Sequence, residues 1–527
     1  MSKAVDMAKV SARGSFHVLW GLVISTVISS IGTIFIARLL GSDLYGLYGI
    51  ALTAPALIGV FRDWGINSAM VKYTAQYRAE DTTAEIRRIL LSGLLFEIIL
   101  GLALSSVGFA LSGFLATSVF HRPELASLIQ IASVSVLATG IINAATAAFT
   151  GVERMELNSV MQICQSIVKV AVIIGLVLLG LGTSGAVTGY TGGLAFGAIV
   201  GTIFVLLIYR KLPKPTESSV GIRNSIKSML TYGTPLSLSM IISTFQIQFF
   251  AFLLPIHYLS DNSIIGNYSL ATTFVVLISF FASPVTTVLF PAFSKLNAQV
   301  EKETLRNVFQ FSVKYASLLV VPVTALVMCL SEPAVSTLFQ NSYSSTALFL
   351  TLLSITYLYT AFGSLSTGNL INSQGQTRLS LYLTIITAVI AFPMGYILIS
   401  IFGVLGLIVT TLTAGLPSIF ISLFWVKKNY GVSLNWVSSA RILLSSGTAA
   451  VLTYALVSYL TWASWIRLIV GVVVFVVIFV FAALLSRSVE RSDINNLRQM
   501  AGGFGVISSL INRVLNFVER IMSTLRL

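Results

Sequence analysis

The feature that most constrains this chain is a succession of apolar segments, each long enough to cross a lipid bilayer. The first, residues 16–37, follows a basic N-terminal stretch, and a Gly41-Ser42 turn separates it from the second, residues 46–61. A membrane-spanning helix needs about 20 apolar residues. Because the apolar runs are continuous rather than alternating, we predict helices and exclude a membrane β-barrel.

The chain also carries too few charges to cover a surface in water. Only 9% of its 527 residues are charged and 56% are hydrophobic, whereas soluble domains carry roughly 25% charged residues. The predicted fold class is therefore an all-α polytopic membrane protein with about fourteen transmembrane helices. The predicted spans are 15–38, 46–67, 89–112, 126–149, 160–180, 188–209, 231–255, 264–290, 311–330, 347–371, 380–400, 404–426, 441–460 and 467–486.

The basic residues predict the orientation of these spans. Most of the 32 lysines and arginines lie in every second loop and in the two termini, while Arg38, Arg122 and Arg467 lie in the opposite loops. The positive-inside rule then places both termini in the cytoplasm, with the first span retained in a cell-membrane protein. Because the net charge of +14 is spread over many loops, we exclude a nucleic-acid partner.

A weak internal repeat divides the chain. Gly46, Tyr48 and Ala51 match Gly266, Tyr268 and Ala271 at a shift of 220 residues, and Gly185 matches Gly406 at a shift of 221. Each repeat holds six predicted spans, so the two copies share one orientation, as parallel repeats in transporters do. The predicted domains are an N-lobe (1–210), a cytoplasmic linker (211–230), a C-lobe (231–428), two extra spans (429–486) and a cytoplasmic tail (487–527).

The tail has its own pattern. Apolar residues recur at helical spacing from Ile507 to Leu525, with polar residues on the other face. This pattern predicts an amphipathic helix that lies in the inner membrane interface or docks on the protein itself.

The motif ARLLGSDLYGLYGIA, followed by a span that ends at WGINSAMVKYTAQ, resembles the opening of polysaccharide and O-antigen flippases. These belong to the multidrug/oligosaccharidyl-lipid/polysaccharide exporter superfamily, and FPAFSKL at 290–296 is similar to the corresponding part of the second lobe. The resemblance implies a V-shaped alternating-access transporter. It also implies that the substrate is a polyprenyl-(pyro)phosphate-linked oligosaccharide, moved from the inner to the outer leaflet for surface polysaccharide or glycan assembly.

Charged residues inside predicted spans are the main candidates for substrate contacts, because such groups are costly in lipid and mark pathways or ion pairs. We expect Lys169, near the middle of the fifth span, and Arg62 to attract the pyrophosphate, and Asp63 and Glu97 to bind a coupling ion or balance the cations. The alternative is structural: Arg62 pairs with Glu97, and Asp63 caps a helix end.

Four further residues complete the candidate set. Gln246 and Gln248 lie two positions apart in the seventh span, so they point to different faces of a helix and at least one can face the substrate. Arg38 and Asp43 flank the first outer turn, where they form either a solvated pair or part of an outer gate.

Other functions are less consistent with the sequence. An integral glycosyltransferase or polymerase needs carboxylates gathered on one face, but the outer loops carry them singly, and no GxxxxGK[ST] phosphate-binding loop is present. We therefore expect a carrier that is not an enzyme and has no cofactor or metal. A peptidoglycan lipid-precursor flippase and a cation-coupled multidrug exporter stay as alternatives. Membrane lipid, and glycosyltransferases or a polymerase of the same pathway, are the further candidate partners.

Overall fold

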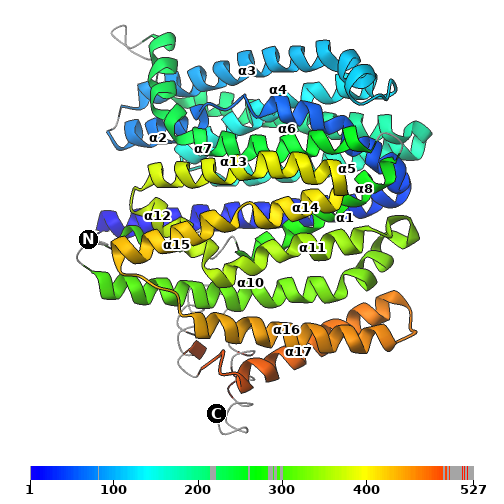
Figure 1. The fold of residues 1–527 in the computed structure, drawn as a ribbon. Coiled ribbons are helices and arrows are strands. Elements are labelled where there is room, and N and C mark those ends of the chain that lie inside the picture. The colour runs from blue at the N-terminus through cyan, green and yellow to red at the C-terminus, as the bar shows by residue number, and fades with distance from the viewer. Residues whose placement is uncertain are drawn as a thin grey trace. The chain divides into compact units, whose positions relative to one another are not determined.

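A computed structural model describes residues 2–80, 82–213, 221–258, 261–282, 289, 293–296, 301–490, 493–494, 498, 513, 516 and 519. The secondary-structure elements in this part of the chain are all helices, as predicted (Figure 1). Contacts between residues group the chain into two compact units. The first comprises Met1–Leu270 and Ala388–Thr410, and the second comprises Ala271–Thr387 and Thr411–Leu527.

The first unit contains the helices of the N-terminal half and α7. Its elements are α1 (Ser2–Gly59), α2 (Ile66–Ala79), α3 (Thr83–Phe114), η1 (Leu115–Val119), α4 (Leu125–Gly151), α5 (Met155–Leu176), η2 (Val177–Leu181), α6 (Gly182–Lys211), α7 (Ile222–His257) and most of α8 (Asn262–Val275). The second half of α13 (Thr377–Phe402) and the first part of α14 (Val404–Thr413) also belong to it.

The second unit contains most of the remaining helices. They are η3 (Val276–Ile278), α10 (Lys302–Phe339), η4 (Gln340–Tyr343), α11 (Thr346–Leu358), η5 (Tyr359–Phe362), α12 (Ser364–Ser373), α15 (Leu416–Tyr430), α16 (Trp436–Tyr459) and α17 (Ser464–Leu485). The predicted boundaries of the two lobes, the linker and the extra spans stay predictions.

The number of spans is not confirmed. Eleven helical segments in the described residues are long and apolar enough to cross a membrane, or twelve if the bent pair Thr346–Phe362 and Ser364–Ser373 is one span. Two of the long segments enclose a break in helical geometry: Gly41 has φ 71° and ψ 172°, and Gly180 has φ 87°. Both values lie in a region that glycine enters without the steric cost of a Cβ. The count of fourteen therefore stays a prediction.

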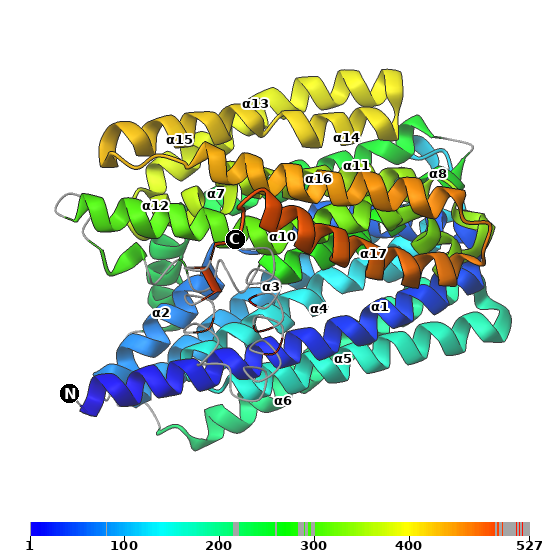
Figure 2. The same cartoon turned by 90° about the horizontal axis from the view of Figure 1, so that it is seen from below.

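Glycines hold α5 and α6 close together, and both views show the two helices side by side (Figures 1 and 2). A Cβ added at each of four glycines of α6, spaced by four residues, would lie 3.0 Å or less from an atom of α5. The pairs are Gly189 with Ile173, Gly193 with Lys169, Gly197 with Gln165, and Gly201 with Met161. Small residues at such spacing let helix backbones approach closely inside a membrane.

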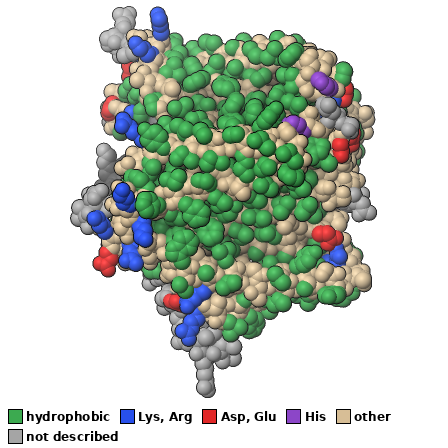
Figure 3. Space-filling model, in the orientation of Figure 1, with side chains coloured by type: hydrophobic (Ala, Val, Ile, Leu, Met, Phe, Trp, Pro, Cys, Tyr) green, Lys and Arg blue, Asp and Glu red, His purple; other side chains and the backbone are tan. Residues whose placement is uncertain are grey.

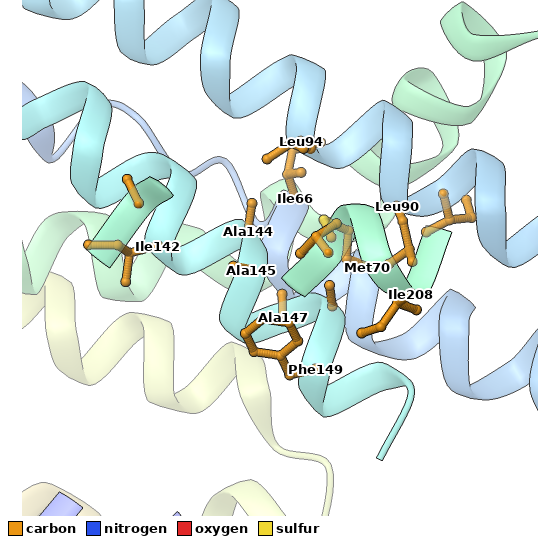
Figure 4. Close-up of a cluster of buried hydrophobic side chains, with 14 of the residues drawn as sticks. Ile66, Met70, Leu90, Leu94, Ile142, Ala144, Ala145, Ala147, Phe149 and Ile208 are labelled. Carbon is orange, nitrogen blue, oxygen red and sulfur yellow. The ribbon is translucent and has the colours of Figure 1, made fainter. Parts of the chain in front are cut away.

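One buried hydrophobic cluster of the first unit lies where α2, α3, α4 and α6 meet. Figure 4 shows Met70, Leu90, Phe149 and Ile208 from these four helices directed into one cluster. Alanines of α4, such as Ala145, leave room for the larger side chains around them. Packing in this cluster holds α3, which carries Glu97, and the beginning of α2, which follows Arg62 and Asp63.

Apolar side chains also cover much of the outside. In Figure 3 hydrophobic residues cover most of the face in view, and lysines and arginines gather near helix ends at the left edge. On α17, for example, Val473 and Val476 are exposed. Exposed apolar surface of this extent is what a lipid-facing helix requires, so the chain is a multi-pass membrane protein.

Some predicted boundaries were wrong. The second predicted span, 46–67, ends as a helix at Gly59, and residues 60–65 form a turn before α2. Arg62 and Asp63 therefore lie in this turn rather than inside a helix. The helix α7 begins at Ile222, before the start of the predicted span 231–255. Most of the predicted amphipathic tail helix, residues 290–292 of the FPAFSKL motif and residues 214–220 lie outside the described residues.

Candidate functional site

Arg62 and Glu97 form a buried ion pair. The Nε atom of Arg62 lies 3.1 Å from Oε2 of Glu97, and the two residues are 7% and 0% exposed. Gly140 of α4 borders the pair, because a Cβ there would lie 2.8 Å from Cδ of Arg62 and 2.9 Å from Oε2 of Glu97. A buried charge is stable only when it is paired, so this is the structural arrangement named as the alternative to substrate binding. A substrate role for Arg62 stays a prediction.

Asp63 and Asn67 extend the pair into a network. The side chain of Asn67 donates hydrogen bonds to Oε1 of Glu97 at 2.8 Å and to Oδ2 of Asp63 at 3.0 Å. The other carboxylate oxygen of Asp63 accepts a hydrogen bond from the Gly65 backbone at 2.8 Å. Asp63 thus stabilises the turn before α2. The Asn67 amide thus joins two carboxylates, and Arg62 lies beside one of them. This geometry fits either a structural network or a cation site.

Lys169 has a different environment. Its stem lies against α6, where a Cβ on Gly193 would be 2.6 Å from the Lys169 Cα, and its Nζ donates to the hydroxyl of Ser29 in α1 at 3.3 Å. Ser29 also contacts Ser166, one turn away on α5. Lys169 is partly buried and forms no ion pair with any described carboxylate. It therefore differs from Arg62, whose charge Glu97 balances.

The two glutamines of α7 are partly buried. Neither Gln246 nor Gln248 makes a hydrogen bond with another described residue, so their amides are available for another partner. Phe245, the residue before Gln246, packs against other aromatic rings: its ring centroid lies 5.7 Å from that of Phe61 and 5.9 Å from that of Phe392 of α13. The prediction that these amides bind sugar hydroxyls is not tested.

Arg38 and Asp43 are both exposed on either side of the Gly41 break. The adjacent Ser42 makes a more specific contact, because its hydroxyl accepts a hydrogen bond from the Ser263 hydroxyl of α8 at 2.7 Å. A gating role for Arg38 and Asp43 stays a prediction, and the structure adds Ser42 and Ser263 to the residues near that turn.

Arg122 forms hydrogen bonds with the C-terminal end of α7. This residue is 4% exposed, lies between η1 and α4, and donates to the carbonyl oxygens of Pro255 at 3.2 Å and of Tyr258. Helix ends leave carbonyls without intrahelical partners, and a guanidinium satisfies them well. Burial lowers the pKa of Arg122 from its usual value, while the charges of Glu124 and Asp43 raise it.

Several of these residues have only a weak signal in the sequence. The spacing of Asn67, one helical turn after Asp63, is a weak signal for a shared hydrogen bond. The glycines spaced by four on α6 are a stronger one, and they predict a close partner helix. No signal along the chain identifies Ser29 as the partner of Lys169, because the two residues are 140 positions apart.

The chain matches a known protein family. A family model described as polysaccharide biosynthesis protein matches residues 11–297, more than half of the sequence. The chain belongs to this family. An uncharacterized membrane protein of Methanocaldococcus jannaschii is 20% identical to this chain over 377 residues, which cover 69% of this chain and 74% of the relative.

Solved structures agree on the fold. The lipid II flippase MurJ in an inward closed conformation has a TM-score of 0.68 at 15% identity, with 89% of this chain and 98% of that chain covered. A multidrug resistance MATE family transporter of the MOP superfamily, in an inward-facing conformation, has a TM-score of 0.64 at 17% identity, with 79% and 98% covered. The expected resemblance to this superfamily is confirmed, and at these identities it concerns the fold.

Proposed function

We propose that this protein is a flippase that moves a polyprenyl-(pyro)phosphate-linked oligosaccharide from the inner to the outer leaflet of the cytoplasmic membrane by alternating access. The family and the transporter fold support a lipid-linked cargo. The protein acts as a carrier and not as an enzyme, and both termini lie in the cytoplasm. Glycosyltransferases or a polymerase of the same pathway supply and use the cargo.

The observation that carries this proposal is the environment of Lys169. An ammonium group within a membrane-spanning helix is costly unless it is paired or functional. Its described contact is a neutral hydroxyl, that of Ser29, so its charge stays available for an anion. A pyrophosphate is the anionic part of the proposed cargo, and Lys169 attracts it. Arg62 contributes once its pairing with Glu97 loosens, and Gln246 and Gln248 bind sugar hydroxyls.

The network of Asp63, Asn67 and Glu97 supports a second element of the proposal. The carboxylates of Asp63 and Glu97 both accept hydrogen bonds from the Asn67 amide. We propose that they bind a proton or a small cation. Uptake there weakens the hold of Glu97 on Arg62 and couples the ion to the movement of the cargo. Arg38 and Asp43 belong to the outer gate in this scheme.

A peptidoglycan lipid-precursor flippase is the second candidate. The lipid II flippase structure covers 89% of this chain and the MATE transporter 79%, which favours a lipid-linked cargo over the drug of a multidrug exporter. The two lipid-linked cargoes share the pyrophosphate and the polyprenyl tail, and they differ in the glycan.

Transport in proteoliposomes tests the proposal. Purified protein is reconstituted with a fluorescent polyprenyl-pyrophosphate-linked oligosaccharide, with lipid II or with a cationic drug, and movement between leaflets is measured. We expect movement of the oligosaccharide and loss of most of it in Lys169→Met. Lys169→Arg keeps the charge and is the matched control, which we expect to retain transport.

Two results would overturn the proposal. Normal oligosaccharide transport by a folded Lys169→Met variant would remove this residue from the mechanism. Movement of lipid II or of the drug, without movement of the oligosaccharide, would assign the protein to one of the alternatives.

A further inference from the structure

A polar pocket of about 300 Å³ lies in the second unit, where the beginning of α16, the segment that follows α17 and the third and fourth turns of α10 come together. Figure 1 shows α16 and α17 side by side next to α10. None of the residues that line this pocket belongs to the candidate substrate site described above. The pocket therefore needs an explanation of its own.

Three cationic side chains line the pocket: Lys314 of α10, Arg441 of α16 and Arg487, which follows α17. Asp493 balances the first of them, because its carboxylate lies 2.6 Å from Nζ of Lys314 and also accepts from the Tyr315 hydroxyl at 3.2 Å. Neither arginine forms an ion pair with any carboxylate in the part of the chain that the structure describes. The arginines therefore leave a local excess of positive charge, which the exposed carboxylate of Glu490 only partly offsets.

The walls of the pocket are held in place. Hydroxyls of Ser445, Ser486 and Ser488 contact one another at 2.7–3.3 Å and tie α16 to the end of α17. Arg441 reaches across this junction, with its Nη1 3.5 Å from the carbonyl oxygen of Arg487. The two arginines are thus positioned by fixed elements and not by a long loop.

The first turn of α16 adds donors for an anion. Asn435 caps this helix by accepting a hydrogen bond from the Ser438 backbone at 3.1 Å. Ser438 lines the pocket, and its buried hydroxyl has no hydrogen-bond partner among the described residues. The N-terminus of a 24-residue helix carries a partial positive charge, which acts together with the two arginines.

The rim of the pocket is apolar. Phe311 and Val437 line it and are 47% and 59% exposed, and the neighbouring Trp436 is 53% exposed. The helices α10, α16 and α17 each qualify as membrane spans, and the pocket lies at the ends of two of them. Cationic groups beside exposed apolar and aromatic side chains at a helix end are suited to the interface between lipid headgroups and acyl chains.

We propose that this pocket binds the phosphate of an anionic membrane lipid, with Arg441, Arg487 and the Ser438 hydroxyl as the donors and with the acyl chains against Phe311 and Val437. A phosphodiester headgroup has the charge and the acceptor oxygens that these donors need. The bound lipid fills the junction of α10, α16 and α17 and stabilises it. This site is separate from the proposed cargo site near Lys169.

Lipid binding by the purified full-length chain tests the proposal. The protein in a nonionic detergent at low salt is titrated with phosphatidylglycerol or with phosphatidylcholine, and bound lipid is measured by native mass spectrometry. We expect tighter binding of phosphatidylglycerol, and about fivefold weaker binding in Arg441→Gln and in Arg487→Gln, since each basic residue near an anionic headgroup contributes on that order. Arg378→Gln removes an exposed charge outside the pocket and is the matched control.

A variant that is expected to strengthen lipid binding keeps the test independent of folding defects. Glu490→Gln removes the negative charge from the pocket, so we expect severalfold tighter binding of phosphatidylglycerol, a gain that misfolding cannot produce. Equal affinities of the wild type, Arg441→Gln and Glu490→Gln would overturn the site. If inorganic phosphate in excess displaces the lipid and the variants change phosphate binding in the same order, the ligand is a free phosphate and the lipid assignment is wrong.

Discussion

Gly46 and Gly266, which hold equivalent positions in the predicted repeat, lie backbone against backbone. A Cβ on Gly46 would be 3.0 Å from the Gly266 nitrogen, and a Cβ on Gly266 would be 3.0 Å from the Gly46 nitrogen. The contact is therefore reciprocal, as expected where two repeats meet around an axis. The hydrogen bond between the Ser42 and Ser263 hydroxyls lies one turn earlier on both helices.

We expect cysteines at this contact to form a disulfide. The hydroxyls of Ser42 and Ser263 are 2.7 Å apart, which brings the two Cβ atoms close to the separation of about 3.8 Å found in disulfides. In a background without Cys164 and Cys329, the Ser42→Cys/Ser263→Cys variant should cross-link under mild oxidation. Transport should stop in the oxidised form and return on reduction, if the contact opens in each cycle.

Gel mobility after cleavage of the chain between the two positions measures this cross-link. The single variants Ser42→Cys and Ser263→Cys are the controls, and neither should respond to oxidant. A cross-linked protein that transports at the normal rate would contradict an opening of this contact.

The ion pair of Arg62 and Glu97 predicts strong coupling in a double-mutant cycle. Arg62→Gln or Glu97→Gln alone leaves a buried charge without its partner, which costs roughly 3–5 kcal/mol of unfolding free energy. Because Arg62→Gln/Glu97→Gln removes both charges, we expect it to be more stable than the sum of the single effects. Unfolding in detergent measures the four proteins, and additive losses would show that the two side chains act independently.

Two adjacent glycines of α6 offer a matched test of helix packing. A Cβ at Gly193 would collide with the Lys169 backbone, whereas a Cβ at Gly192 would meet nothing within 4 Å. We expect Gly193→Ala to lower stability by about 1–3 kcal/mol through overpacking, and Gly192→Ala to change it little. Melting temperatures compare the two, and an equal effect would mean that α5 and α6 do not pack as described.

Arg122→Gln should loosen the end of α7. The substitution removes the hydrogen bonds to the Pro255 and Tyr258 carbonyls, and bonds from charged donors contribute about 1.5–3 kcal/mol. Hydrogen exchange should therefore rise in residues 252–258, with Arg378→Gln as the control.

The effect of Arg122→Gln on hydrogen exchange should not depend on pH. Burial lowers the pKa of Arg122, but a guanidinium stays protonated far above neutrality. The effect of Arg122→Gln should thus be equal at about pH 6 and pH 8. A loss of protection that appears at only one pH would show that another titrating group controls this helix end.

Much of the fold was accessible from the sequence, because hydropathy is a property of each segment by itself. The apolar runs predicted the helices α16 and α17 to within a few residues of their observed ends. The second predicted span, 46–67, ended too late: the apolar run reaches Phe61, but the helix ends at Gly59, and Gly65 with φ 82° precedes a new helix. Hydropathy does not report backbone geometry.

The sequence predicted which residues belong to the candidate site. It did not predict the hydrogen bonds and ion pairs between them. The intramembrane charges Lys169 and Glu97 were identified because charge in an apolar segment is conspicuous. The sequence leaves open whether Arg62 binds substrate or pairs with Glu97, and in the structure Nε of Arg62 lies 3.1 Å from Oε2 of Glu97. That outcome depends on how α3 is rotated toward the turn after α1, which is set by packing on α4.

The sequence by itself determined that this chain enters a membrane as helices, which family it belongs to, and which few charges lie within its apolar body. Those properties follow from the free energy of transferring each segment into lipid, which is nearly additive along the chain. Only the tertiary structure decided that Glu97 balances Arg62, that Ser29 contacts Lys169, and that Arg441 and Arg487 line one pocket. Side chains so far apart in the chain meet only when helices pack at particular rotations, and shape complementarity between helices sets those rotations.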